Sequence, residues 1–507
     1  MTLRLRPQHR RWRRAPGFTL VEMLVALAIT LIMMSAVVSL FGLISDNVSG
    51  SRSVIELSER LRAARNRLQA DLQGVTATMQ PPLRPGDDEG YFELIEGPIH
   101  DEEKIDSTIP NFDRFSAAGD VDDVLMFTTR SRGEPFVGLF TPPGLPTRTV
   151  ESQIAEVMYF CAPAVDATGR EMDPILYFDS GTATPIRLYT LYRRVLLVLP
   201  SLNRKGTFPQ ADLPYFVEND ISARLGPTQP GPAVPNSLGD LTKRENRFAH
   251  HPVVGSATGF PFNVQRTTIT AATGFGPDAQ LRPFEGERLG DDVLLTNVLA
   301  FDVQVFDPGA PVEVAAGFAR TPEDPGYNPP PLPSATVFGA YANLGSDHYT
   351  RAAYPNAQFC RDPNSTGGTQ IGISIHPGVT PGLPANNLQP ELLNPVWGED
   401  VSGEQAFTYD TWSMHYENNG IREHPAGNFP SGASRLDAAT NGLDDDGNNI
   451  VDDLTYPHIP SGSLRGEAET APPFPAPLRG IRIRVRVYEP DSKQVRQVTV
   501  VQDFLPE

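Results

Sequence analysis

A single charged side chain interrupts a long apolar run near the N-terminus. Between Phe18 and Ser45 the only charged residue is Glu22, which lies five positions after Gly17. As a helix this run would measure about 42 Å, at about 1.5 Å per residue, which is enough to cross a bilayer. Burying a carboxylate in such a span costs about 2.5–3.5 kcal/mol or more, so we expect Glu22 to have a cationic partner.

Oxygen-bearing side chains alternate along an acidic segment nearer the C-terminus, at residues 441–453. The pattern resembles the D-x-D-x-D-G calcium loops of EF-hand, dockerin and thrombospondin type 3 sites. Its candidate ligands are Asp444, Asp446, Asn448 and Asp452. Hard oxygen ligands on alternate residues can surround Ca²⁺, although Thr455 stands where such a loop has its bidentate glutamate. We interpret the segment as a structural calcium site, and a solvated acidic turn is the alternative.

No other group of residues forms a recognisable catalytic or cofactor-binding pattern. The nine histidines make no H-E-x-x-H motif, and there is no G-x-S-x-G elbow. Acidic neighbours such as Asp122 and Asp123 would point to opposite faces of a strand. Cys161 and Cys360 have no metal-ligand spacing and could form one disulfide in an oxidising compartment, a pairing that the sequence leaves open. We therefore expect a protein that is not an enzyme and that requires no cofactor.

The chain is strongly acidic, with 42 basic and 61 acidic side chains and a formal charge of −19. Six arginines and no acid precede Gly17, so loss of residues 1–17 would change the charge from −19 to −25. Broad binding to nucleic acid is not expected, because it needs clustered Lys and Arg. The same six arginines predict that the N-terminus stays in the cytoplasm and that the bulk of the chain is extracytoplasmic.

One long helix is expected to carry the N-terminal residues, from about Phe18 to Met79, ending at the prolines that follow. Its first part, 18–45, is the apolar span. In its second part, 46–80, apolar residues recur every three or four positions and should pack on the rest of the protein. These residues are Leu57, Leu61, Ala64, Leu68, Leu72 and Val75. Asp71 falls among the charged residues of the remaining surface, four positions after Arg67.

Beyond residue 81 the sequence indicates strands separated by irregular stretches. The predicted strands are 123–129, 154–160, 188–199, 294–306, 481–487 and 494–504. Arg482, Arg484 and Arg486 alternate with apolar residues, which we interpret as a solvent-exposed face, with an anion site as the alternative. Residues 203–290 and 308–477 are rich in Pro, Gly, Asn and Asp, which predicts long loops or an inserted subdomain.

The N-terminal residues resemble the signal of the type IV prepilin and pseudopilin superfamily. An arginine-rich leader precedes Gly17-Phe18-Thr19-Leu20-Val21-Glu22 and the apolar run. The resemblance implies cleavage between Gly17 and Phe18 by prepilin peptidase, and N-methylation of Phe18. It also implies that Glu22 pairs with the N-terminal ammonium of a neighbouring subunit, which is sensible because opposite charges in an apolar medium are tolerable together and costly apart. Further implied partners are other pilins or pseudopilins and an inner-membrane assembly platform.

The resemblance also implies a fold and a layout of the chain. The fold class is α+β and pilin-like: a long N-terminal helix, with a transmembrane first half, packed on an antiparallel β-sheet head with large loop-rich insertions. The segments are a cleaved leader (1–17), the two helix halves (18–45 and 46–80) and an extracytoplasmic, periplasmic head (81–507).

The order of the pieces along the chain is similar to that in the J-type minor pseudopilins of type II secretion and in PilW-like minor pilins. We therefore predict a structural subunit, anchored in the bacterial inner membrane and assembled into a type II secretion pseudopilus or a type IV pilus. An adhesion or DNA-uptake minor pilin, whose head insertions bind a surface or ligand, is the alternative.

Overall fold

The computed structural model describes residues 19–504 with several gaps. The longer gaps are 97–118, 206–212, 225–232, 251–282, 361–406 and 412–473, and the shorter ones include 178–185 and 332–336. The chain divides into two compact units, Met1–Leu57 with Glu489–Gln494 and Ser58–Tyr488 with Val495–Glu507.

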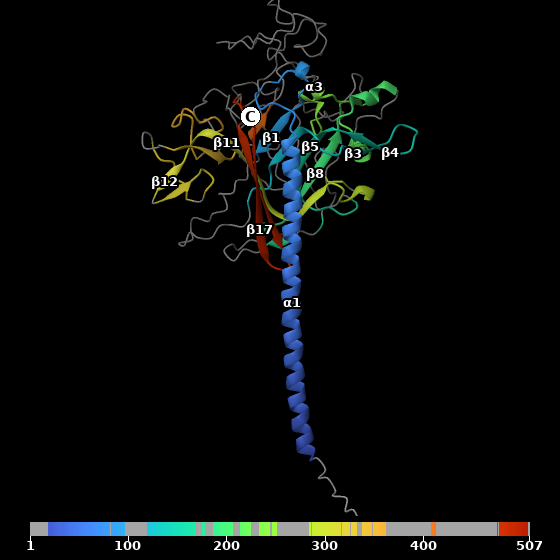
Figure 1. Ribbon diagram of the computed structural model, residues 1–507, viewed down its shortest axis with the longest axis vertical. Coiled ribbons are helices and arrows are strands. Elements are labelled where there is room, and N and C mark those ends of the chain that lie inside the picture. Colours follow the sequence, from blue (N-terminus) through green and yellow to red (C-terminus); the bar gives the residue numbers. More distant parts are fainter. Residues whose placement is uncertain are drawn as a thin grey trace, which may run out of the picture. The chain divides into compact units, whose positions relative to one another are not determined.

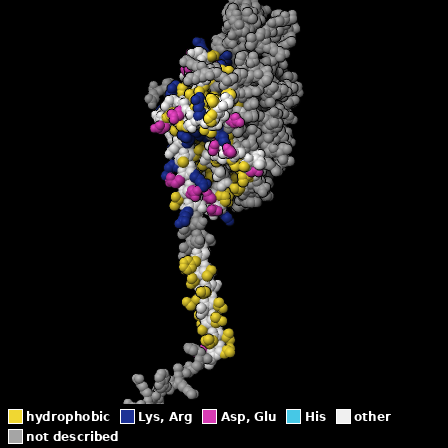
Figure 2. Space-filling view, turned by 90° about the vertical axis from the view of Figure 1, so that its right-hand side faces the viewer, with side chains coloured by type: hydrophobic (Ala, Val, Ile, Leu, Met, Phe, Trp, Pro, Cys, Tyr) yellow, Lys and Arg dark blue, Asp and Glu magenta, His cyan; other side chains and the backbone are white. Residues whose placement is uncertain are grey.

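Helix α1 (Leu20–Gln73) is continuous over 54 residues. Its stretch Leu20–Gly42 is long and apolar enough to cross a membrane, and none of it is buried. Figure 2 shows apolar side chains along this part of the helix. The predicted apolar stripe of the second half is confirmed from Leu57 to Leu72. Its buried members are Leu57, Leu61, Ala64, Leu68 and Leu72.

The helix ends at Gln73, six residues before the predicted end at Met79. The helix ends where it meets strand β2 (Val124–Arg130), well before the prolines at which we predicted its end. The hydroxyl of Thr129 donates to the carbonyl of Asp71 at 2.6 Å, and the backbone N–H of Arg130 donates to the carbonyl of Gly74 at 2.7 Å. Val75, predicted to be helical, instead forms a β-bridge with Thr129. The carbonyl of Asp71 in the last turn, and that of Gly74 just beyond the helix, thus find partners on a strand, which satisfies groups that a helix leaves open at its end.

A nine-stranded antiparallel sheet follows the helix (Figure 1), in the order β15-β1-β2-β5-β8-β11-β16-β17, with β14 also paired to β11. All six predicted strands are confirmed within it. They are β2, β5 (Ile154–Ala162), β8 (Tyr189–Leu197), β11 (Val293–Pro311), β16 (Gly480–Glu489) and β17 (Gln494–Asp503). Together, helix and sheet form the predicted α+β, pilin-like arrangement.

Three strands of this sheet were not predicted. They are β1 (Phe92–Glu96), β14 (Phe338–Ala342) and β15 (Phe407–Asp410). Because β14 and β15 lie within residues 308–477, that stretch contributes to the main sheet and is more than an irregular insertion.

Small elements surround the sheet. Within the described part of the chain, four two-stranded pairs join β3 (Phe136–Phe140) with β4 (Arg148–Ser152), β6 (Leu176–Tyr177) with β7 (Ile186–Arg187), β9 (Ala223–Arg224) with β10 (Val234–Pro235), and β12 (Glu313–Ala315) with β13 (Phe318–Arg320). The short helices are α2 (Leu213–Glu218) and α3 (Leu238–Leu241), and the 3₁₀ turns are η1 (Pro85–Asp87), η3 (Pro200–Lys205) and η5 (Gly286–Arg288).

Two adjacent arginines of β8 show what covers each face of the sheet. Arg193 pairs with Asp71 of α1 at 2.6 Å, whereas Arg194 pairs with Asp292 at 2.7 Å and lies 3.5 Å from the ring centre of Phe284. Successive side chains of a strand point to opposite faces. The last turns of α1, which carry Asp71, therefore lie on one face of the sheet, and the segment that leads into β11 lies on the other.

The surface position predicted for Asp71 is wrong, because its side chain is only 3% exposed. It accepts hydrogen bonds from Arg193 and from the hydroxyl of Tyr159, which lie opposite each other on β8 and β5. A bidentate partner in the interior has therefore replaced the local i,i+4 pair with Arg67.

The predicted solvent face of β16 is only partly open to solvent. Arg482 donates to Gln304 at 2.7 Å, Arg484 to Asp302 at 2.7 Å and Arg486 to Gln497 at 2.8 Å. All three arginines are half-buried. The basic residues of the alternating pattern therefore bond to polar residues of the neighbouring strands β11 and β17.

Candidate functional site

The N-terminal candidate site is described only in part. Gly17 and Phe18 lie outside the described residues, whereas Glu22 lies in the first turn of α1. The backbone N–H of Thr19 donates to the Glu22 carboxylate at 2.8 Å, and the N–H of Glu22 donates to the Thr19 hydroxyl at 3.2 Å. This reciprocal arrangement is a capping box, which satisfies two N–H groups that a helix start leaves open. It holds the carboxylate at the helix start, three positions from Thr19.

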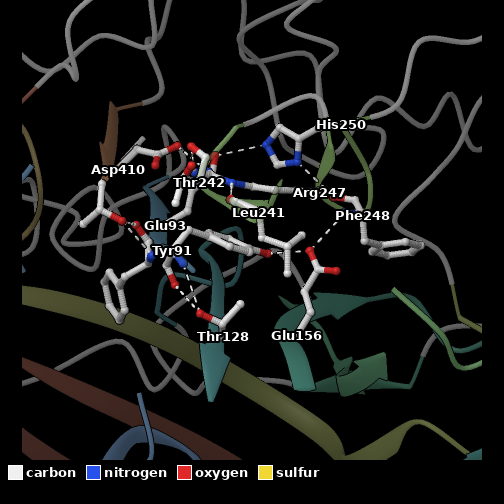
Figure 3. Close-up of polar contacts among 12 residues, drawn as sticks. Tyr91, Glu93, Thr128, Glu156, Leu241, Thr242, Arg247, Phe248, His250 and Asp410 are labelled. Carbon is white, nitrogen blue, oxygen red and sulfur yellow. Dashed lines mark hydrogen bonds and ion pairs between the residues drawn. The ribbon is translucent and has the colours of Figure 1, made fainter. Parts of the chain in front are cut away.

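A buried ionic centre is built around Arg247, which follows α3 and is fully buried (Figure 3). Its Nη1 donates to Glu93 at 2.8 Å and to Asp410 at 2.7 Å, and its guanidinium lies 4.0 Å from the centre of the Tyr91 ring. Glu93 and Asp410 are direct partners on β1 and β15. Two carboxylates facing each other across strands repel, so Arg247 is the group that makes this pairing tolerable. His250 adds a contact to Glu93 at 3.2 Å.

Burial by itself lowers the pKa of Arg247, but the attraction of Asp410 and Glu93 outweighs this effect and raises it. The arginine therefore stays charged. Its role is to bind the segment that follows α3 to the edge of the sheet.

A third buried carboxylate, Glu156 on β5, completes the attachment of this segment. It accepts hydrogen bonds from the hydroxyls of Tyr91 at 2.8 Å and Ser222 at 2.7 Å, and from the backbone N–H of Phe248 at 3.0 Å. Burial raises the pKa of Glu156, although these three donors oppose the shift. Both oxygens of Glu156 thus accept hydrogen bonds, which is typical of a structural centre.

Three buried carboxylates form a separate acidic cluster. Glu96 is the last residue of β1, and Asp120 and Asp123 precede β2. One oxygen from each lies within 4.8 Å of the others, and all three side chains are fully buried. Burial, followed by repulsion from neighbouring carboxylates, raises the pKa of each. Oxygen-only donor sets of this kind suit Ca²⁺ or Mg²⁺.

The other two predicted sites give different outcomes. Cys161 and Cys360 are both buried and are not bonded to each other, so the disulfide is not formed in this structure. The candidate calcium ligands Asp444, Asp446, Asn448 and Asp452 lie outside the described residues.

Sequence reasoning missed both buried centres. Asp122 and Asp123 were expected to diverge on a strand, but β2 begins only at Val124, and the N–H of Asp122 donates to Asp120 at 3.0 Å. The segment before β2, residues 119–123, therefore gathers carboxylates outside the strand. For Arg247 there was no local signal, because its partners Glu93 and Asp410 are 154 and 163 positions away.

Comparison with known families identifies the N-terminal segment. Residues 12–38 match the family model of the prokaryotic N-terminal methylation motif. No curated protein and no solved structure matches the chain. The motif is the type IV pilin and pseudopilin signal, and it implies a prepilin-like subunit that is processed by prepilin peptidase. With the helix Leu20–Gly42, it also indicates an anchor in the inner membrane.

Proposed function

We propose that this protein is a minor pilin-like subunit with a structural, non-enzymatic role. It is cleaved between Gly17 and Phe18, is N-methylated at Phe18, and enters a type II secretion pseudopilus or a type IV pilus. One observation carries the proposal: the methylation motif at residues 12–38 overlaps a helix whose first 23 residues, Leu20–Gly42, are largely apolar and unburied within the chain. Such a helix needs a membrane or other helices to cover it.

The arginines that precede Gly17 support an orientation with a cytoplasmic N-terminus and an extracytoplasmic head, since basic flanks stay in the cytoplasm. We further propose that the apolar helix bundles with those of other pilins or pseudopilins after extraction by the assembly platform. The large head is sterically more compatible with a tip or priming position than with a repeating major subunit.

The mass of the mature N-terminus tests this proposal. The protein is isolated from membranes of cells with and without prepilin peptidase. We expect an N-methylated Phe18 only in cells that contain the peptidase. An intact Met1 in both strains, or a cut elsewhere, would contradict it.

Deletion of the gene then separates the roles. Loss of secreted enzymes supports the secretion pseudopilus, whereas loss of attachment or of transformation supports an adhesion or DNA-uptake pilin.

A further inference from the structure

The acidic cluster of Glu96, Asp120 and Asp123 has the geometry of a cation site. Two oxygens that bind one Ca²⁺, each at about 2.3–2.6 Å, are at most about 4.6–5.2 Å apart. Three oxygens spaced evenly around such an ion would be about 4.0–4.5 Å apart. The three carboxylate oxygens lie within 4.8 Å of one another, so a shift of a few tenths of an ångström at most would let one ion contact all of them.

Each of the three carboxylates is oriented through one of its oxygens by a backbone N–H. The donors come from three different parts of the chain. The hydrogen bonds are Leu344 to Glu96 Oε2 at 3.3 Å, Asp122 to Asp120 Oδ1 at 3.0 Å and Val303 to Asp123 Oδ2 at 2.6 Å. Metal ligands are held in this way by hydrogen bonds from outside the coordination shell.

The second carboxylate oxygen of Asp123, Oδ1, differs from the first, Oδ2, in having no hydrogen-bond donor among the described residues. Asp123 is fully buried, yet its Oδ1 accepts no hydrogen bond from the part of the chain that the structure describes. A buried carboxylate oxygen without a donor or a cation is costly. A bound cation would remove this cost and would also offset the repulsion among the three carboxylates.

We propose that Glu96, Asp120 and Asp123 bind one divalent cation, Ca²⁺ by the chemistry of the donors. The ion joins the end of β1 to the segment before β2, across the 22 residues (97–118) between them in the sequence. Through Val303 and Leu344 the same site is connected to β11 and to the segment after β14. It is a structural site, distinct from the loop at residues 441–453.

The test uses the full-length protein in detergent, stripped of metal with EGTA, and measures Ca²⁺ binding by calorimetry and the unfolding temperature with and without Ca²⁺. The background is a double variant, Asp444→Asn with Asp446→Asn, which removes the other candidate site. In this background we expect one Ca²⁺ to bind and to raise the unfolding temperature. Adding Asp123→Asn should weaken binding at least about tenfold, since a charged ligand is lost. A parallel titration with Mg²⁺ should give weaker binding.

The matched control for lost charge is Asp291→Asn, because the Asp291 side chain is 53% exposed. It should bind Ca²⁺ as its parent does. In EGTA the Asp123→Asn protein should be as stable as its parent or more so, because one buried charge is removed. The proposal fails if the background protein, with Asp123 intact, binds no Ca²⁺. That result does not depend on whether the Asp123→Asn variant folds. It also fails if Asp123→Asn binds Ca²⁺ as tightly as Asp291→Asn.

Discussion

At the scale of single residues, the head is organised by buried charges that are matched over long sequence distances. Arg247 lies between Glu93 and Asp410, and Arg193 pairs with Asp71. Each pair joins a different covering segment to the sheet. Buried ion pairs contribute little net stability compared with apolar residues, but removing one partner leaves the other charge buried and unpaired, which is costly. These arginines therefore specify how the segments attach to the sheet.

Replacing Arg247 with Met tests this interpretation. Because Glu93 and Asp410 would remain buried without their shared cation, we expect the free energy of unfolding to fall by about 3–5 kcal/mol. Denaturant unfolding of the full-length protein, followed by near-UV circular dichroism, measures the change.

The control is Arg62→Met, since the Arg62–Glu59 pair on α1 has side chains that are 66% and 63% exposed. There we expect a change below about 1 kcal/mol. Similar effects of the two substitutions would show that the Arg247 centre does not hold the fold.

At the scale of elements, the junction of α1 with β2 determines where the helix stops. A Cβ at Gly74 would overlap the carbonyl oxygen of Arg130 and crowd the hydroxyl of Thr129. Glycine is therefore needed here for close approach of two backbones. The same contact brings Thr76 to β2, where its backbone N–H donates to Thr128 at 3.0 Å.

We expect Gly74→Ala to lower the free energy of unfolding by about 1–3 kcal/mol, as overpacking does in a tight interior. Gly133→Ala is the matched control, because nothing lies within 4 Å of a Cβ at that position. Thermal unfolding of the two variants beside the unchanged protein measures the difference. Equal unfolding temperatures for the two variants would argue against a tight junction.

At the scale of the whole molecule, two parts of the chain differ in how their apolar side chains are covered. The side chains of Leu20–Gly42 are not buried by the rest of the chain, whereas the sheet and its covering segments bury a large apolar core. The apolar side chains of Leu20–Gly42 need a membrane or a helix bundle to cover them, whereas those of the core are already covered within the chain. This difference is what a subunit that moves from a membrane into a filament requires.

The Glu22 carboxylate allows a test of assembly apart from processing. We expect Glu22→Gln to be cleaved normally but to enter filaments at least about tenfold less, because the ammonium of a neighbouring subunit would lose its partner in apolar surroundings. Co-purification with other pilins measures incorporation.

Thr30→Val is the control within the same helix, since the Thr30 hydroxyl bonds only to the carbonyl of Ala26 among the described residues. It should assemble normally. Normal incorporation of Glu22→Gln would argue against the charge pairing.

The local features of this protein follow from its sequence. The methylation motif, the apolar span, the stripe from Leu57 to Leu72 and the six strands are patterns of neighbouring residues, and their periods reflect helix and strand geometry. Such patterns can be identified without knowing what lies across the fold.

Only the tertiary structure decided which charged residues are buried and with what partner. Asp71 and Arg484 resembled surface residues by their spacing, yet each bonds a residue far away in the sequence, at separations of 122 and 182 positions. The cluster of Glu96, Asp120 and Asp123 likewise depends on how the end of β1 meets the segment before β2. Sequence periodicity determines which residues share a face of one element, whereas the pairing of charges depends on which elements become neighbours, and that is set by the packing of the whole chain.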